Sequence, residues 1–226
     1  MDDQLYDVYH LRDLRLLRVL RELSVTACSF FHKDTDEPIL IAEDSKLENL
    51  RALEQLVLSY SKDTEGFESS NINDSGPSVA TNCSWDFHFP SNLKKIVLRD
   101  FPLTSNSLST IAKLPNLEEL ILMRTIMQGG EWNMGEEDTF ENLKYLGLCE
   151  VTLAKWKVGE ESFPMLEKLQ MWGCRMLEEI PPSFGDICSL KIIQLAESPQ
   201  LDDSTLKIKQ YSEHMTGRDE LKVEIF

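Results

Sequence analysis

Apolar residues along this chain follow a spacing that fits neither a single amphipathic helix nor a single alternating strand. The clearest example runs from Phe163 to Pro181. Its apolar positions are three, three, two, three, three and three residues apart, at Phe163, Leu166, Leu169, Met171, Cys174, Leu177 and Ile180. The pair spaced by two predicts a short strand, and the spacing on either side predicts turns. This is the pattern of one leucine-rich repeat.

The same frame occurs seven times along the sequence. The inward-facing residue that marks the strand of each unit is Leu23, Leu56, Ile96, Leu120, Leu146, Leu169 and Ile193. These markers are separated by 33, 40, 24, 26, 23 and 24 residues, and the last four intervals lie in the range of about 20 to 29 residues typical of such repeats. The pattern predicts an α/β fold, a leucine-rich-repeat solenoid (horseshoe) of about seven recognisable repeats, with parallel strands on the concave face.

Three stretches depart from the frame within what we expect to be a single domain over 1–226. Residues 1–16 predict an irregular N-terminal turn, and 59–89 a long polar insertion that explains the interval of 40 residues. The interval of 33 residues must contain an insertion of its own. A shorter excursion is expected at 128–138. Residues 202–226 predict a C-terminal cap, in which an acidic N-cap cluster starts a helix and an alternating segment forms a last strand.

Composition narrows the classes of function. The net charge is -16 and the pI about 4.7, which disfavours nucleic acid and anionic membrane surfaces as partners. The sequence contains no apolar run of membrane-spanning length and begins without a signal-peptide pattern. The odd number of cysteines, five, fits a reducing compartment, so we expect a cytoplasmic protein. Glycosylation sequons at Asn73 and Asn82 leave an extracellular repeat protein as an alternative.

Patterns that carry catalytic chemistry are missing from the sequence. There is no phosphate-binding loop, nucleophile elbow, HExxH helix or CxxC pair. Cys28 with His32 and Cys83 with His88 are isolated pairs, whereas a zinc site needs three or four ligands. We therefore expect neither an enzyme nor a site for a metal or cofactor.

The residues between the inward leucines of each strand should point outward and form rows on the concave face. The candidate protein-binding face consists of Lys95, Val97, Arg99, Ile121, Met123, Tyr145, Lys168, Gln170 and Trp172. An apolar strip rimmed by cations is typical of a protein-binding surface. Two alternatives remain open: isolated exposed apolar residues are ordinary, and Trp172 can fold over its neighbours as part of the core.

A second candidate surface is a basic stripe on this otherwise acidic chain. Arginines recur every three residues at Arg12, Arg15, Arg18 and Arg21. The stripe is either a docking face for an acidic partner or an ordinary solvated surface.

Several phrases resemble the C-terminal repeats of plant intracellular immune receptors of the coiled-coil, nucleotide-binding, leucine-rich-repeat class. They are F-E-N-L-K-Y-L-G-L from Phe140, F-P-M-L-E-K-L-Q-M-W-G-C from Phe163, F-G-D-I-C-S-L-K-I-I-Q-L from Phe184 and the tail from Ser204 to Met215. Near the N-terminus, L-R-L-L-R-V-L from Leu14 resembles the start of that domain. The late-blight-resistance type is the most similar.

The resemblance implies a non-enzymatic recognition domain of a plant disease-resistance receptor. In that family the repeats help to sense pathogen effectors, directly or through a host protein, and restrain a nucleotide-binding switch module, which the present sequence lacks. The stripe would then dock onto that module. The alternative is a repeat-only cytosolic scaffold or adaptor with no immune role.

Overall fold

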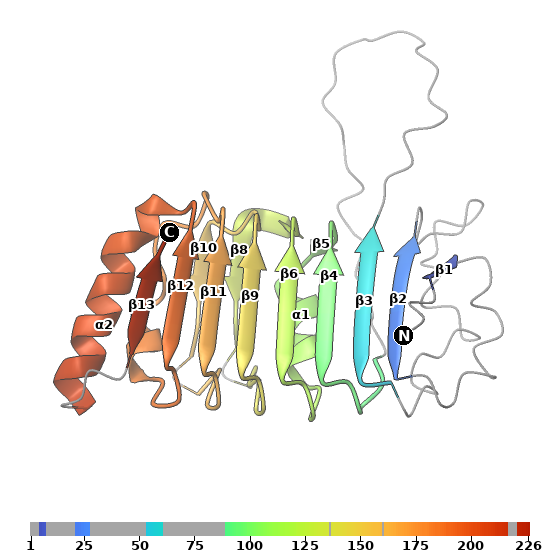
Figure 1. Cartoon of the computed structure of the whole chain (residues 1–226), viewed down its shortest axis with the longest axis horizontal. Coiled ribbons are helices and arrows are strands. Elements are labelled where there is room, and N and C mark those ends of the chain that lie inside the picture. Colours follow the sequence, from blue (N-terminus) through green and yellow to red (C-terminus); the bar gives the residue numbers. More distant parts are fainter. Residues whose placement is uncertain are drawn as a thin grey trace, which may run out of the picture.

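A nine-stranded parallel sheet dominates the computed structural model, which describes residues 5–7, 21–27, 53–60, 89–135, 137–159, 161–216 and 221–226 (Figure 1). The strands lie side by side in the order of the sequence. They are β1 (Leu5–Asp7), β2 (Glu22–Ala27), β3 (Gln55–Tyr60), β4 (Lys95–Arg99), β6 (Glu119–Met123), β9 (Tyr145–Cys149), β11 (Lys168–Trp172), β12 (Ile192–Ala196) and β13 (Lys222–Ile225). The predicted α/β class, with a large parallel sheet and few helices, is confirmed.

The strands are in register at the marker positions that the sequence pattern identifies. Leu56 pairs with Ile96, and the pairing continues through each later strand up to β12. Side chains of the marker residues and of the residues two positions later point behind the sheet, where each is at most 1% exposed. This set comprises Leu56, Leu58, Ile96, Leu98, Leu120, Leu122, Leu146, Leu148, Leu169, Met171, Ile193 and Leu195. Parallel in-register stacking thus places equivalent apolar side chains in continuous buried rows.

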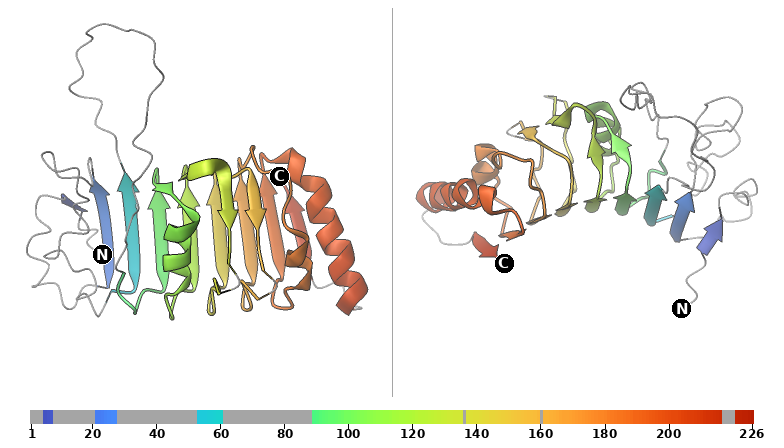
Figure 2. Two further views of the ribbon diagram at one scale, coloured as in Figure 1. Left: turned by 180° about the vertical axis from the view of Figure 1, so that it is seen from behind. Right: turned by 90° about the horizontal axis from the view of Figure 1, so that it is seen from above.

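The connecting segments between β4 and β12 lie on one side of the sheet, which follows a shallow arc with its hollow side facing away from them (Figure 2). We call that hollow side the concave face. The connecting elements are β5 (Pro102–Leu103), α1 (Ser105–Ala112), β7 (Ile126–Met127), η4 (Gln128–Gly130), β8 (Glu131–Asn133), β10 (Lys155–Lys157) and η5 (Pro182–Asp186). β5 pairs with β7, and β8 with β10. Thr104 caps the start of α1, because its hydroxyl accepts a hydrogen bond from the Ser107 N–H.

An aromatic cluster fills the space between the sheet and these connecting elements. Trp132 of β8 and Trp156 of β10 stack with ring centroids 5.1 Å apart, and Phe140 stacks on Phe163 at 5.3 Å. Trp132 meets the edges of both phenylalanine rings, and Phe184 completes the cluster beside Trp156. The segment 128–138, expected as a shorter excursion from the leucine frame, carries Trp132, only 2% exposed, into the core.

Charged residues alternate in sign at the position before each strand of the main sheet from β3 to β12. The series is Glu54, Lys94, Glu118, Lys144, Glu167 and Lys191. Glu54 pairs with Lys94, Glu118 with Lys144, and Glu167 with Lys191, at N···O distances of 3.4, 2.8 and 2.8 Å. The hydrogen bond from Lys191 holds the pKa of Glu167 below its usual value, and the bond to Glu118 raises the pKa of Lys144. Such exposed pairs add little stability. If strands were paired with one repeat skipped, however, residues of like charge would lie together, such as Glu54 and Glu118.

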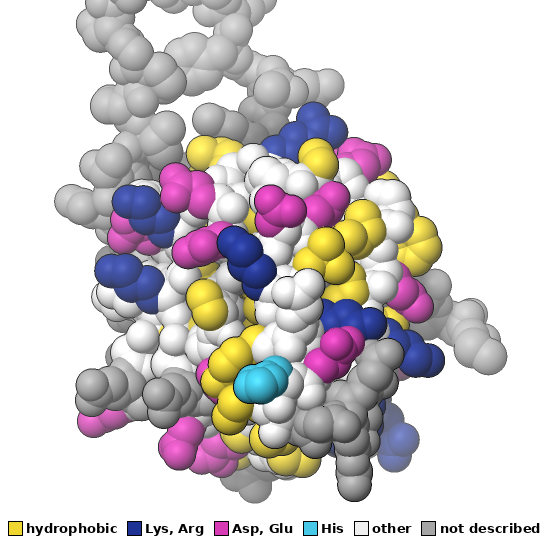
Figure 3. Space-filling view, turned by 90° about the vertical axis from the view of Figure 1, so that its left-hand side faces the viewer, with side chains coloured by type: hydrophobic (Ala, Val, Ile, Leu, Met, Phe, Trp, Pro, Cys, Tyr) yellow, Lys and Arg dark blue, Asp and Glu magenta, His cyan; other side chains and the backbone are white. Residues whose placement is uncertain are grey.

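The C-terminal end of the sheet is formed by η6 (Pro199–Leu201), α2 (Asp202–Thr216) and β13. Asp202 and Asp203 lie in the first turn of α2, where the helix dipole favours negative charge. Thr205 and Ile208 are buried, and the Tyr211 ring lies over Gly185 of η5. The outer surface of this end shows apolar side chains scattered among charged ones (Figure 3).

Several predicted features fall outside the described residues. These include 61–88 of the polar insertion and all of 1–16 except β1. Within the described part of the chain, none of the helices combines the length and apolar character needed to cross a membrane.

Candidate protein-binding face

The outward side chains of the sheet form three rows across the concave face. The first row contains Lys95, Glu119, Tyr145, Lys168 and Ile192, the second Val97, Ile121, Gly147, Gln170 and Gln194, and the third Arg99, Met123, Cys149, Trp172 and Ala196. All nine residues of the predicted face therefore lie on four consecutive strands, β4, β6, β9 and β11. Parallel pairing brings them together although they are up to 77 positions apart in sequence (Lys95 to Trp172).

One member of the predicted face is not available for contact. Val97 is only 5% exposed, which corrects its assignment as an outward contact residue. It occupies the middle row, between Lys95 and Arg99 of its own strand and beside Ile121 of the next. An outward direction on a strand therefore does not ensure exposure.

Tyr145 lies in the first row of the face, reaches Gly147 of the second row and is held by three neighbours. Its hydroxyl lies 3.0 Å from Gln170 Oε1, and the Lys168 ammonium lies 5.5 Å from the ring centroid. Gly147 leaves room for the ring, because a Cβ there would lie 3.1 Å from the tyrosine hydroxyl oxygen. Burial, and secondarily the charge of Glu119, raises the pKa of the Tyr145 phenol. The phenol therefore remains a neutral hydrogen-bond donor at physiological pH.

The cations around the face differ in how far they are neutralised. Lys95 forms a 2.8 Å ion pair with Glu119 of the next strand. Lys168 contacts the Tyr145 ring. Arg99 is exposed and forms no ion pair with any other described residue. Within the described structure, Arg99 thus presents an uncompensated positive charge at one end of the face.

Trp172 is the most prominent apolar side chain of the predicted set. It is 48% exposed, which rules out its alternative placement as part of the core. Its neighbours in the third row are Cys149 and Ala196, both small and partly exposed. Burial raises the pKa of the Cys149 thiol, so this cysteine is held in its protonated, weakly nucleophilic form.

A ridge of residues in the left-handed backbone region borders the third row. Each strand from β4 to β12 is followed by a residue with a positive φ: Asp100, Arg124, Glu150, Gly173 and Glu197. The N–H groups of the first four donate to the last carbonyl of the next strand, at 2.7 to 2.9 Å. Four of these five positions carry charged side chains in a conformation that favours glycine. Sequence reasoning missed the ridge, because a single glycine is its only conventional signal.

Ion pairs cross this ridge at two places. Arg124 contacts both carboxylate oxygens of Asp100, with N···O distances of 2.7 and 2.8 Å, and this hydrogen bonding raises the pKa of the guanidinium. Arg175 lies 3.2 Å from Glu197. Glu150 has no ion pair among the described residues, so the ridge presents an uncompensated carboxylate as well as paired charges.

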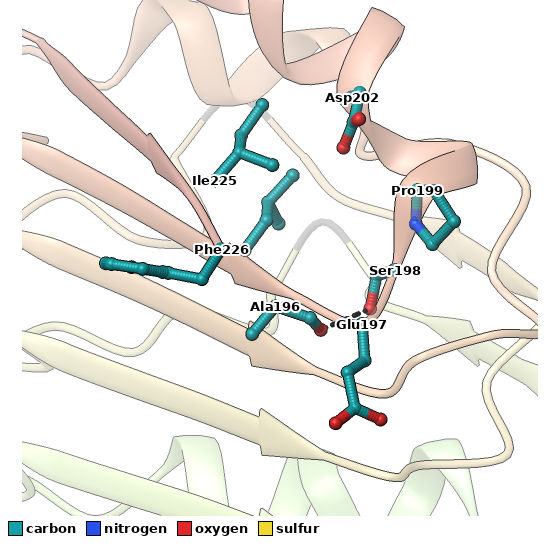
Figure 4. A pocket seen from close by; sticks show the side chains of 8 residues that line it. Ala196, Glu197, Ser198, Pro199, Asp202, Ile225 and Phe226 are labelled. Carbon is teal, nitrogen blue, oxygen red and sulfur yellow. Dashed lines mark hydrogen bonds between the residues drawn. The ribbon is translucent and has the colours of Figure 1, made fainter.

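Two cavities open beside the last part of the ridge. One, of about 590 Å³, is lined by Arg175, Glu197, Pro199 and Gln200. The other, of about 320 Å³, lies between the ends of β12 and β13 and the start of α2 (Figure 4). The Ser198 hydroxyl at this second cavity donates to the Ala196 carbonyl at 3.1 Å. Among the described residues, no group of three or more His, Cys, Asp or Glu side chains is arranged to hold a metal ion.

Most of the predicted basic stripe lies outside the described residues. Arg12, Arg15 and Arg18 lie among the residues that are not described. Arg21 is exposed just before β2, and its carbonyl accepts hydrogen bonds from the Glu54 and Gln55 N–H groups. The docking role of the stripe stays a prediction.

Comparisons with known proteins relate part of the chain to plant disease resistance. No protein-family model matches it. A segment of 106 residues, 46% of the chain, is 45% identical to a late blight resistance protein homolog of Solanum demissum. A segment of 104 residues, 45% of the chain, is 43% identical to a late blight resistance protein of the same species. These matches cover only 14% and 8% of the two relatives. Slightly less than half of the chain is therefore similar to a small part of plant late blight resistance proteins, which supports a disease-resistance context.

Proposed function

We propose that the chain is a leucine-rich-repeat solenoid of about seven repeats that recognises other proteins through its concave face. The observation that carries the proposal is the presence of exposed Trp172, half-buried Tyr145 and exposed Arg99 on one rigid sheet surface. Tryptophan, tyrosine and arginine are the residue types that contribute most to protein interfaces. We take the chain to be a recognition domain and not an enzyme.

The biological setting follows from the partial similarity to late blight resistance proteins. We propose that this domain belongs to a plant disease-resistance receptor in the cytoplasm. Its partners would be a pathogen effector or a host protein that the effector modifies, and a nucleotide-binding switch module that the domain restrains.

The geometry of the face suggests how it achieves affinity. Tyr145 is already fixed by Gln170, Lys168 and the space over Gly147. Binding therefore orders little additional freedom of the Tyr145 side chain, which lowers the entropic cost of association. Trp172 is the exposed anchor that a partner can enclose.

The test is co-purification with a supplied nucleotide-binding module of a plant immune receptor and, separately, with candidate effectors. The face variant combines Arg99→Glu, Lys168→Glu and Trp172→Ala. The matched control carries Lys155→Glu, Lys157→Glu and Ile126→Ala, three exposed positions among the connecting elements on the opposite side. We expect the face variant to lose binding and the control to retain it, with both folded by circular dichroism.

Equal binding by both variants would refute the concave face as the recognition surface. Absence of any immune partner, together with face-dependent binding of an unrelated cytosolic protein, would favour the scaffold or adaptor alternative. An effector that binds the control but not the face variant would support the receptor function directly.

A further inference from the structure

We propose that the third row of the concave face binds an extended, proline-rich segment of a partner protein, with an acidic residue at the end that meets Arg99. This inference rests on the proposed recognition function of the face and specifies the chemistry of the partner. It is carried by the sizes, the spacing and the hydrogen-bonding groups of the third row.

From Met123 to Phe226, large and small side chains alternate along this row. Beyond Arg99 on β4 come Met123, Cys149, Trp172 and Ala196 on successive paired strands. Phe226 continues β13 beside Ala196, because its N–H bonds to the Leu195 carbonyl at 2.9 Å. Trp172 and Phe226 are 48% and 79% exposed. The small residues Cys149 and Ala196 thus flank Trp172 in this row, and we call the two positions above their short side chains hollows.

The spacing of these hollows matches one backbone conformation of a bound segment. Neighbouring strands lie about 4.8 Å apart, so the two hollows are about 9.6 Å apart. A polyproline II helix has three residues per turn and rises about 3.1 Å per residue, which places side chains i and i+3 on one face about 9.3 Å apart. Proline-rich segments of this kind bind surfaces on which aromatic side chains border grooves.

The other regular conformations fit less well. In an extended strand, side chains on one face recur about every 6.6 to 6.8 Å, so successive ones cannot occupy both hollows. In an α-helix, i and i+7 are about 10.5 Å apart, but the residues at i+3 and i+4 lie between them on the same face and would meet Trp172. Of these conformations, only the polyproline II helix spans the two hollows without placing another side chain of the same face over the Trp172 ring.

The charge of Arg99 continues the same period. It lies two strands beyond Cys149, again about 9.6 Å away, and has no ion pair among the described residues. A segment with apolar or proline residues at i and i+3 in the hollows would therefore bring its residue i+6 to the guanidinium. A carboxylate there would form the charge-assisted pair that Arg99 lacks within the described structure.

The hydrogen-bonding groups of the third row are complementary to those of a proline-rich segment. The third row itself offers donors, the Trp172 indole N–H and the Arg99 guanidinium, and no strong side-chain acceptor. A proline-rich segment has the complementary inventory, because its carbonyls are free to accept while each proline lacks an N–H to donate.

In the experiment, the whole chain is titrated with a synthetic peptide of pattern P-x-x-P-x-x-E whose two ends are blocked, and binding is measured by calorimetry. We expect binding that weakens about tenfold or more with Trp172→Ala, as for a central aromatic anchor. Ala196→Leu should weaken it similarly, because it fills a hollow without removing any group. The control Asn106→Leu, exposed on α1, should bind as the unchanged chain does. Replacing the glutamate by lysine should weaken binding more at low than at high salt.

Three results would overturn the inference: no binding of the peptide, unchanged binding by Ala196→Leu, or equal binding of a peptide whose two prolines are only two positions apart. Tighter binding of a helical peptide of equal charge would also overturn it. If the peptide fails while a whole partner protein still binds in a Trp172-dependent manner, this inference fails and the proposed recognition function stands. If partner proteins bind equally well to the triple face variant, the proposed function itself fails.

Discussion

The contact between α2 and η5 offers a quantitative test of how the C-terminal end packs. Gly185 of η5 is buried beneath the Tyr211 ring of α2. A Cβ at position 185 would lie 2.6 Å from Tyr211 Cδ1, 3.4 Å from Cε1 and 3.5 Å from the Ile208 carbonyl oxygen. Carbon atoms pack at about 3.5 to 4.0 Å. The Gly185→Ala substitution therefore forces the tyrosine ring, or the helix that carries it, to move by about 1 Å.

The size of the effect follows from two opposing contributions. Overpacking of this kind costs about 1 to 3 kcal/mol. Replacing glycine by alanine also restricts the unfolded chain, which stabilises the fold by about 0.4 to 1 kcal/mol. The φ of Gly185 lies outside the left-handed region, so no backbone strain adds to the clash. The middle of each range gives a net loss of about 1.3 kcal/mol in the free energy of unfolding.

The assay is urea unfolding of Gly185→Ala, Tyr211→Ala and the double variant, analysed as a double-mutant cycle. Once Tyr211 is truncated, the added methyl group has room, so the double variant should be more stable than the sum of the single effects predicts. Gly135→Ala is the control, because its Cβ would meet Asp138 at an ordinary 3.5 Å. Equal stability of the Gly185→Ala and Gly135→Ala variants, or additive behaviour in the cycle, would refute this account of the contact.

Three further predictions address the core, a buried thiol and the basic stripe. Leu169→Ala should lower the unfolding free energy by about 2 to 5 kcal/mol by opening a cavity. Gln170→Ala, on the opposite face of β11, should lower it far less. Similar losses of unfolding free energy for the two variants in urea would refute the register. Burial raises the pKa of Cys174 from 9.0 to about 11, so the unfolded chain releases this proton first as the pH rises. Stability should be intact below pH 9 and fall towards pH 11, by at most about 1.4 kcal/mol per pH unit; a Cys174→Ala variant with the same slope in pH-dependent urea titrations would contradict this. Charge reversal of the whole stripe should abolish co-purification with a nucleotide-binding module at low salt, while any single reversal should have little effect; undiminished binding would leave a solvated surface comprising Arg12, Arg15, Arg18 and Arg21.

The inward positions of the sheet could be predicted because they depend on local spacing. A strand repeats its orientation every two residues, so Leu146 and Leu148 are both assigned to the core by their own neighbours in sequence. Parallel pairing then needs only that equivalent residues align, and Leu146 pairs with both Leu120 and Leu169. The outward rows follow from the same register, which is why the predicted face lies on adjacent strands.

Features made by residues from different connecting segments could not be predicted in the same way. Trp132 and Trp156 are outside the leucine frame, and their stacking depends on the pairing of β8 with β10. Val97 was misassigned because its outward direction on β4 does not determine its exposure, which is only 5%. The ridge of positive-φ residues carries charges such as Glu150, where a glycine would have been the usual signal. These features depend on residues that lie about one repeat or more apart in the sequence.

The separation between inward and outward side chains determines how the proposed function can be tested. Leu169 and Met171 are fully buried, whereas Gln170 and Trp172 on the same strand face outward. A change at Trp172 or Arg99 therefore removes a contact group without opening a cavity, so lost binding by a variant of unchanged urea stability reports on recognition itself. Tyr145 is the exception, because its ring covers Gly147 and its hydroxyl lies within hydrogen-bonding distance of Gln170. Its substitution would alter packing and recognition together, which is why Trp172, Ala196 and Arg99 are the more decisive positions on this face.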